Sequence, residues 1–183
     1  MIYLIGGPPR VGKSTLAWML LERAGLPNLP TDTLVSMLQH AAPEHGVRHG
    51  DHPDKAVPAQ PFLHAFLRAV AESLDATDPA DGYVVEGDVV TPATAAALAA
   101  DGIPATAVFL GSTTLTADLL SAAPDDWLAG SPAAEYERTA AWIRERSIAL
   151  RTECESAGHV FVDTGRAHQE ALEFAYEALT GHA

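Results

Sequence analysis

The sequence is poor in cysteine and contains no long apolar run. Its only cysteine is Cys154, so no disulfide can form within the chain, and we expect a cytoplasmic protein. No apolar run reaches the roughly 18–20 residues of a membrane-spanning helix, so we expect no membrane partner. The apolar start of the chain carries no basic leader region, which argues against a signal peptide.

Positive charge is also scarce. The 183 residues include 11 lysines and arginines against 24 acidic residues, for a net charge of −13. Such a surface repels nucleic acid, which binds along basic stripes, so we expect a small-molecule partner and no nucleic acid. Five of the 11 cations lie after residue 137, which requires an explanation. They are Arg138, Arg144, Arg146, Arg151 and Arg166.

A glycine-rich motif follows the first apolar residues, in the stretch IYLIGGPPRVGKSTL (2–16). Gly7, Gly12, Lys13 and Ser14 match G-x-x-x-x-G-K-[ST], the P-loop. Glycine lets the backbone wrap around an anion, Lys13 reaches the β- and γ-phosphates, and the Ser14 hydroxyl holds Mg²⁺. The motif predicts binding of ATP with Mg²⁺; a chance match is disfavoured because a strand and a helix flank it. The expected nucleotide contacts are Gly7, Pro8, Pro9, Arg10, Val11, Gly12, Lys13, Ser14 and Thr15.

Short apolar segments alternate with helical patterns along the whole chain. The predicted strands lie near 1–5, 27–30, 83–85, 105–110 and 160–162. The predicted helices lie near 13–24, 34–38, 61–74, 92–100, 114–122, 133–157 and 167–179, with Thr31 or Asp32 and Thr91 as N-caps. This alternation predicts one α/β domain over 1–183, a three-layer, doubly wound parallel sheet. Ligands of such sheets bind at the carboxyl ends of the strands.

Three further segments lie at such strand ends. They are LPTDTLVSML (29–38), YVVEGD (83–88) and VDTGR (162–166), the last preceded by an arginine-bearing helix. A GTPase is disfavoured because neither lysine, Lys13 or Lys55, lies in an Asn-Lys-x-Asp guanine-binding motif. Motor ATPases are disfavoured because the third strand ends in Glu86-Gly87 rather than Asp-Glu, and because the chain is too short for their additional segments.

With the P-loop, these segments resemble the small P-loop kinases of the nucleoside and nucleotide kinase-like type. In layout the chain is closest to enzymes similar to chloramphenicol phosphotransferase and to shikimate and gluconate kinases. The resemblance implies the strand order 2-3-1-4-5, an acceptor-covering segment at about 42–75 and a helical lid at about 124–157.

Asp32 is the candidate general base, because phosphoryl transfer to an alcohol needs a carboxylate to orient the hydroxyl and accept its proton. The alternative is that Asp32 only caps a helix. Glu86 and Asp88 are candidates for holding Mg²⁺ through water, and Asp88 is alternatively an acceptor contact. A solvated turn after a strand is the competing interpretation for both carboxylates.

The cluster of arginines fits a lid that closes over the triphosphate. Arg144 and Arg151 are seven residues apart and share one helix face, so both are candidates for neutralising the charge of the transferred phosphoryl group. Arg146 lies on nearly the opposite face of the same helix. Pairing with glutamates on a solvated helix is the alternative. By resemblance, Arg166 and Gly165 border the adenine.

The segment from 42 to 75 is the candidate acceptor cover. The predicted acceptor contacts of this segment, beside Asp32 and Asp88, are Arg48, His49, His52, Phe62 and Phe66. Three histidines in the same segment, His45, His49 and His52, suggest a zinc site, but the stretch contains no cysteine and a dispersed loop is favoured.

Together these features predict an ATP-dependent phosphotransferase acting on a hydroxyl group of a metabolite, natural product or antibiotic. An acceptor without a phosphate is favoured because no arginine follows the Glu86-Gly87 turn. A nucleoside or nucleotide kinase is the first alternative, and an ATP-binding regulatory protein is the second. The sequence leaves open whether the protein is a monomer or a homodimer.

Overall fold

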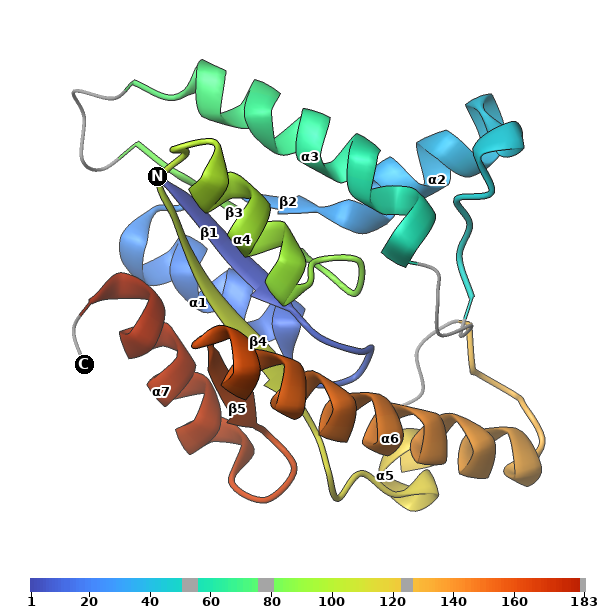
Figure 1. The fold of residues 1–183 in the computed structure, drawn as a ribbon. Coiled ribbons are helices and arrows are strands. Elements are labelled where there is room, and N and C mark those ends of the chain that lie inside the picture. The colour runs from blue at the N-terminus through green and yellow to red at the C-terminus, as the bar shows by residue number, and fades with distance from the viewer. Residues whose placement is uncertain (51–55, 76–80, 123–126, 182–183) are drawn as a thin grey trace.

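A single parallel sheet forms the centre of the protein (Figure 1). A computed structural model describes residues 1–50, 56–75, 81–122 and 127–181. The five strands lie in the order β2-β3-β1-β4-β5, and every neighbouring pair is parallel. Their bounds are β1 (Ile2–Gly6), β2 (Asn28–Pro30), β3 (Tyr83–Gly87), β4 (Ala105–Gly111) and β5 (Val160–Asp163). The predicted fold class and strand order are therefore confirmed.

Helices cover both faces of the sheet (Figure 1). One face carries α1 (Lys13–Ala24) and α7 (His168–Thr180), and the other carries α3 (Ala56–Ser73), α4 (Pro92–Ala100) and α6 (Ala133–Ala157). The remaining elements are α2 (Thr31–Ala41), η1 (Pro43–His45) and α5 (Ala117–Ala122). None of the helices in these described ranges is both long and apolar enough to cross a membrane.

Alternate strand residues enter two separate cores, because successive side chains point to opposite faces of a sheet. Ile5 and Val84 belong to the core beneath α1 and α7, whereas Leu4 and Val85 belong to the core beneath α3 and α4. The second core also contains Cys154, and burial raises the pKa of this thiol to about 12. A neutral, buried thiol packs as a small apolar group.

Most of the predicted element bounds hold, with three differences. α3 begins at Ala56 rather than near residue 61, so Pro61 lies inside the helix, where its missing N–H group removes one helical hydrogen bond. α5 begins at Ala117 rather than Thr114. Pro30, not Thr31 or Asp32, occupies the N-cap position of α2, and no side chain there makes a capping hydrogen bond. The N-cap prediction for α2 is therefore wrong.

The register of the strands brings the predicted site segments together. Gly6, the last residue of β1, lies beside Gly87 of β3, and Pro30 of β2 lies beside Glu86. The P-loop, the start of α2 and the turn after β3 therefore leave the sheet at one edge.

The contact between α2 and β3 leaves no room for a side chain at residue 87. A Cβ atom on Gly87 would lie 1.7 Å from Thr31 Oγ1 and 2.9 Å from Thr31 Cβ. Thr31 is fully buried, and its hydroxyl has no hydrogen-bond partner in the described part of the chain. Glycine at this position therefore fixes how closely α2, with Asp32 in its first turn, approaches the sheet.

We expect Gly87→Ala to lower the free energy of unfolding by about 1–3 kcal/mol, the usual cost of overpacking. Adding Thr31→Ala should recover part of this loss, because it removes the oxygen that the new methyl group meets. Urea denaturation of the two single variants and the double variant measures both effects. Equal stability of Gly87→Ala and the wild type would show that α2 is not held by this contact.

Candidate active site

The P-loop is the turn between β1 and α1, and its backbone conformation depends on glycine. Gly7 has φ of 142° and Gly12 has φ of 94°, both in the region that L side chains rarely adopt. A Cβ atom on Gly7 would also lie 2.1 Å from the carbonyl oxygen of Leu110 in β4. Arg10 is the only non-glycine residue with positive φ (67°) in the described ranges. Such conformations concentrate at ligand-binding turns.

Lys13 and Ser14, the two chemically active residues of the motif, lie at the start of α1. Lys13 Nζ donates to the carbonyl oxygen of Pro8 at 2.8 Å, which places the ammonium group across the mouth of the loop. Ser14 Oγ donates to Glu86 Oε1 at 3.2 Å. The residues that the motif assigns to phosphate and metal binding therefore converge with the carboxylate at the end of β3.

Glu86 is a buried acid, with only 7% of its surface exposed. Burial raises its pKa above the usual value, and the positive charge of Lys13 and the Ser14 hydrogen bond oppose the shift. Asp32 and Asp88 raise the pKa further through their negative charges. A buried carboxylate beside a hydroxyl group is an oxygen donor set of the kind that Mg²⁺ prefers, so Ser14 and Glu86 fit this ion.

A cavity of about 550 Å³ opens beside the P-loop. Pro9 of the loop, Asp32 of α2 and Asp88 after β3 line one part of it. His49 and Gly50 line another part, and His49 Nε2 lies 2.8 Å from Ser36 Oγ of α2. The structure thus places both predicted acceptor carboxylates, Asp32 and Asp88, at one cavity that borders the phosphate-binding turn.

The opposite wall of the cavity was not predicted from the sequence. It is formed by Trp127 and by three residues of α6, namely Glu135, Thr139 and Trp142. Thr139 follows Glu135 by four residues and Trp142 follows Thr139 by three, so the three side chains share one face of the helix. This spacing is visible in the sequence. The sequence-based prediction for this helix named Arg144 and Arg151 instead, because arginines are the usual phosphate-binding residues of a kinase lid.

Of the predicted acceptor contacts in α3 and the preceding loop, His49 lines the cavity, whereas Arg48, Phe62 and Phe66 lie elsewhere. Phe62 packs against His45, with ring centroids 4.9 Å apart, and both Phe62 and Phe66 pack against the second core. Arg48 is exposed, and neither Arg48 nor the two phenylalanines line the cavity. The two phenylalanines anchor the segment that carries His49 rather than facing the cavity themselves.

The histidines of this segment do not converge in the described part of the chain. His45 contacts Phe62, His49 contacts Ser36, and His52 lies outside the described residues. Within the described ranges, no three histidine, cysteine or acidic side chains are placed to hold a metal ion together.

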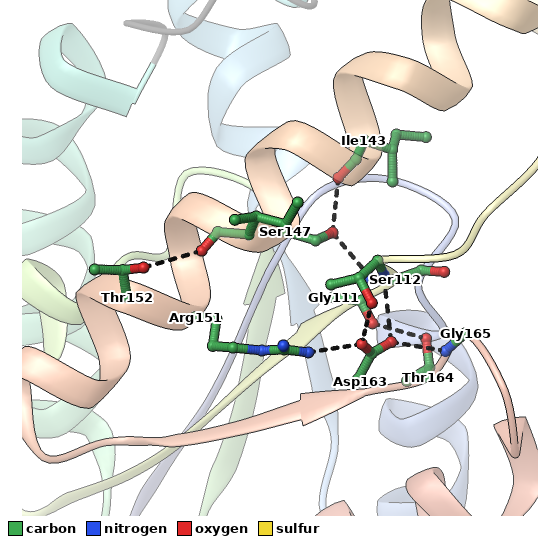
Figure 2. Close-up of polar contacts among 11 residues, drawn as sticks. Gly111, Ser112, Ile143, Ser147, Arg151, Thr152, Asp163, Thr164 and Gly165 are labelled. Carbon is green, nitrogen blue, oxygen red and sulfur yellow. Dashed lines mark hydrogen bonds and ion pairs between the residues drawn. The ribbon is translucent and has the colours of Figure 1, made fainter.

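Two arginines of α6 contact the loop after β4 and the end of β5. Arg144 donates to the carbonyl oxygen of Leu115 at 2.6 Å. Arg151 donates to Asp163 at 2.7 Å (Figure 2). The Arg151 guanidinium group also lies over the ring of Phe161, 5.0 Å from the ring centroid. Both predicted catalytic arginines therefore lie next to the carboxyl ends of the strands but do not line the cavity. Arg146, on the opposite face, pairs with Glu153 at 2.5 Å.

Asp163 joins α6 to the two loops at the β5 edge of the sheet (Figure 2). It accepts hydrogen bonds from Thr113 Oγ1 at 2.5 Å and from the Gly165 amide at 3.0 Å, in addition to that from Arg151. Although burial acts to raise the pKa of Asp163, these hydrogen bonds and the charge of Arg151 outweigh it and lower the pKa. Arg166, which follows Gly165, is exposed beside this network.

Comparison with known proteins identifies the fold. A scan against protein-family models finds no match, and a search of curated proteins finds none. Among solved structures, a gluconokinase from Sinorhizobium meliloti 1021 matches with a TM-score of 0.62 at 17% identity, over 99% of this chain and 92% of that one. A shikimate kinase from Bacteroides thetaiotaomicron matches with a TM-score of 0.58 at 15% identity, over 98% of each chain.

A third structure, a shikimate kinase from Acinetobacter baumannii in complex with shikimate, matches with a TM-score of 0.56 at 14% identity. That match covers 99% of this chain and 93% of the other. Together with the strand order and the P-loop, these likenesses show that the chain has the fold of the small P-loop kinases.

We expect Asp163→Asn to lower the free energy of unfolding by about 1–3 kcal/mol at pH 7, because it removes the charge that Arg151 and Thr113 contact. The pKa of Asp163 is lower in the folded protein than its unfolded value near 3.8, so the ionised carboxylate stabilises the folded state at pH values above 3.8. This contribution is lost as the pH falls from 3.8 through the lowered pKa. The difference between variant and wild type should therefore shrink below about pH 4.

Urea denaturation between pH 7 and pH 3 measures this dependence. Asp118→Asn, at an exposed position in the first turn of α5, is the matched control and should leave the stability nearly unchanged. A difference that stays constant across the whole pH range would contradict the assigned role of the Asp163 charge.

Proposed function

We propose that this protein is an ATP-dependent kinase that transfers the γ-phosphoryl group to a hydroxyl group of a small molecule. One observation carries the proposal. The cavity lined by Asp32 and Asp88 directly adjoins the P-loop through Pro9, so a carboxylate and a triphosphate-binding turn face a common space. A nucleotide-binding protein without an acceptor has no need of such a cavity.

In this reaction Asp32 orients the acceptor hydroxyl and accepts its proton as the oxygen attacks the γ-phosphorus. The new O–P bond forms while the bond between the γ-phosphorus and the β,γ-bridging oxygen breaks, and ADP leaves with that oxygen. The P-loop amides and Lys13 bind the phosphate oxygens. Mg²⁺, held by Ser14 and by Glu86 or Asp88 through water, would neutralise charge on the phosphates.

The exposed position of Asp32 supports its role as the base. Asp32 lies in the first turn of α2, where no side chain makes a capping hydrogen bond, so helix capping does not account for it. Its neighbour Thr31 is fully buried and cannot reach an acceptor. Arg144 and Arg151 are proposed to move from Leu115 and Asp163 to the transferred phosphoryl group when the substrates bind.

We expect Asp32→Asn to lower kcat by about 10²–10⁴-fold, because the amide cannot accept the hydroxyl proton. The affinity for ATP should stay within about twofold of the wild type, because Asp32 lies outside the P-loop. A screen of hydroxylated compounds for acceptor-dependent ADP release identifies an acceptor, and the kcat ratio is then measured with it.

Asp118→Asn serves again as the control, since this acid lies in the first turn of α5 and does not line the cavity. Unchanged kcat in Asp32→Asn would remove Asp32 from the mechanism. Nucleotide binding without acceptor-dependent turnover by any compound would instead favour a regulatory protein, and efficient phosphorylation of nucleoside monophosphates would favour a nucleotide kinase.

A further inference from the structure

We propose that His168 strengthens nucleotide binding, because its imidazolium form adds a positive charge beside the P-loop. The inference rests on the proposed function, since it concerns the nucleotide that the P-loop would hold. His168 is the first residue of α7, and no motif of the sequence includes it. The inference therefore assigns a role to a residue that the P-loop signature does not reach.

The sheet brings His168 to the P-loop from the other end of the chain. β1 and β5 both pair with β4 in parallel, so the turns after β1 and β5 leave the sheet at the same edge. α7 accordingly lies beside α1 on one face of the sheet (Figure 1).

The contact between His168 and the P-loop is close. A Cβ atom on Gly12 would lie 2.9 Å from His168 Cε1 and 3.3 Å from His168 Nε2. Leu172, one turn further along α7 and fully buried, would meet the same atom at 3.1 Å. The edge of the imidazole ring therefore takes the place of a side chain at Gly12, directly before Lys13.

Two helices begin at this contact. Gly12 is the N-cap of α1 and His168 is the first residue of α7, and no side chain caps either helix. The positive end of a helix macrodipole lies at its N-terminus, where anions are stabilised. The positive ends of both helices therefore lie beside the turn that the motif assigns to phosphate.

The neighbouring segments carry four further charged side chains. They are Arg10 and Lys13 of the P-loop, Arg166 before α7 and Glu170 in its first turn. Within the described ranges, no hydrogen bond or ion pair joins another residue to the His168 ring, which is exposed. Imidazole groups ordinarily gain a proton between pH 8 and pH 5. Protonation of this one places a further cation against the P-loop.

The expected effect on affinity is moderate because water and salt screen the charge of an exposed ring. One added positive charge beside the phosphate-binding turn should strengthen binding by about two- to fivefold rather than by orders of magnitude. The gain should depend on pH, because protonation creates the charge, and on salt, because counterions screen it.

Three forms of residue 168 test the charge. His168→Gln removes the charge at every pH, and His168→Lys provides a permanent one, so the wild type should change between the two. Position 168 is exposed, so both substitutions are compatible with the fold. Titration with methylanthraniloyl-ADP, a fluorescent ADP analogue, in the presence of Mg²⁺ measures the affinity of each form at pH 6 and pH 8.

At pH 6 the affinity of the wild type should approach that of His168→Lys and exceed that of His168→Gln by about two- to fivefold. At pH 8 the wild type should match His168→Gln. Raising KCl from about 0.05 M to about 0.5 M should reduce the difference at pH 6, because the screening length becomes shorter.

Comparison with His168→Gln at each pH removes the contribution of other titrating groups. These groups include the phosphates of the probe and the buried Glu86, whose pKa is raised by burial. His159→Gln is the matched control, because His159 directly precedes β5 at the opposite edge of the sheet and should not affect binding at either pH.

Equal affinities of the wild type and His168→Gln at pH 6 would overturn the inference. A difference that persists at pH 8, or that is insensitive to salt, would also overturn it, because the ring would then act through packing rather than charge. An equal effect of His159→Gln would show that the pH dependence does not originate at the P-loop.

Acceptor-dependent ADP release separates the inference from the proposed function. Binding of the ADP analogue that depends on the charge at residue 168, without phosphorylation of any screened hydroxyl compound, would leave the inference standing and overturn the kinase. Phosphorylation of an acceptor, together with an affinity that does not respond to residue 168, would support the kinase and overturn the inference. Absence of nucleotide binding to the wild type would overturn both.

Discussion

The site depends on the close approach of backbone segments at the carboxyl edge of the sheet. Gly7 lies so near Leu110 that a methyl group would overlap its carbonyl oxygen, and Gly87 lies equally near Thr31. These contacts determine where the P-loop and the first turn of α2 leave the sheet. The P-loop amides and Asp32 are therefore positioned by close packing at two glycines, against the backbone of Leu110 and the side chain of Thr31.

Three of the few cations of this acidic chain lie at the edge of the sheet that carries the P-loop. Lys13, Arg144 and Arg151 each contact a backbone carbonyl group or a carboxylate at that edge. Such contacts limit the conformational freedom of the side chains and keep the positive charge close to where phosphates bind. With a net charge of −13, few cations remain to attract anions elsewhere. Of the arginines in the last third of the sequence, Arg144 and Arg151 lie at this edge, whereas Arg138 and Arg146 pair with glutamates of α6.

The fold was more predictable than the site because periodicity and the P-loop are local signals. The strands, the bounds of α1, α4 and α6 and the glycine-rich turn could all be read from neighbouring residues, and the resemblance added the strand order. The cavity wall could not be read in this way. Whether Trp142 or Arg144 faces the acceptor depends on how α6 is rotated against the sheet. That rotation is set by distant contacts such as the one between Arg151 and Asp163.

α6 connects the two halves of the site. Its first part supplies Glu135 and Trp142 to the cavity, and Arg144 and Arg151 follow within about 14 Å along the axis, at 1.5 Å per residue. An acceptor bound in this cavity, as the proposed function requires, would contact the same helix that carries the arginines. A shift of this helix towards the acceptor would therefore move the arginines relative to the triphosphate. In the proposed kinase, one helix would therefore connect acceptor binding with charge neutralisation at the γ-phosphate.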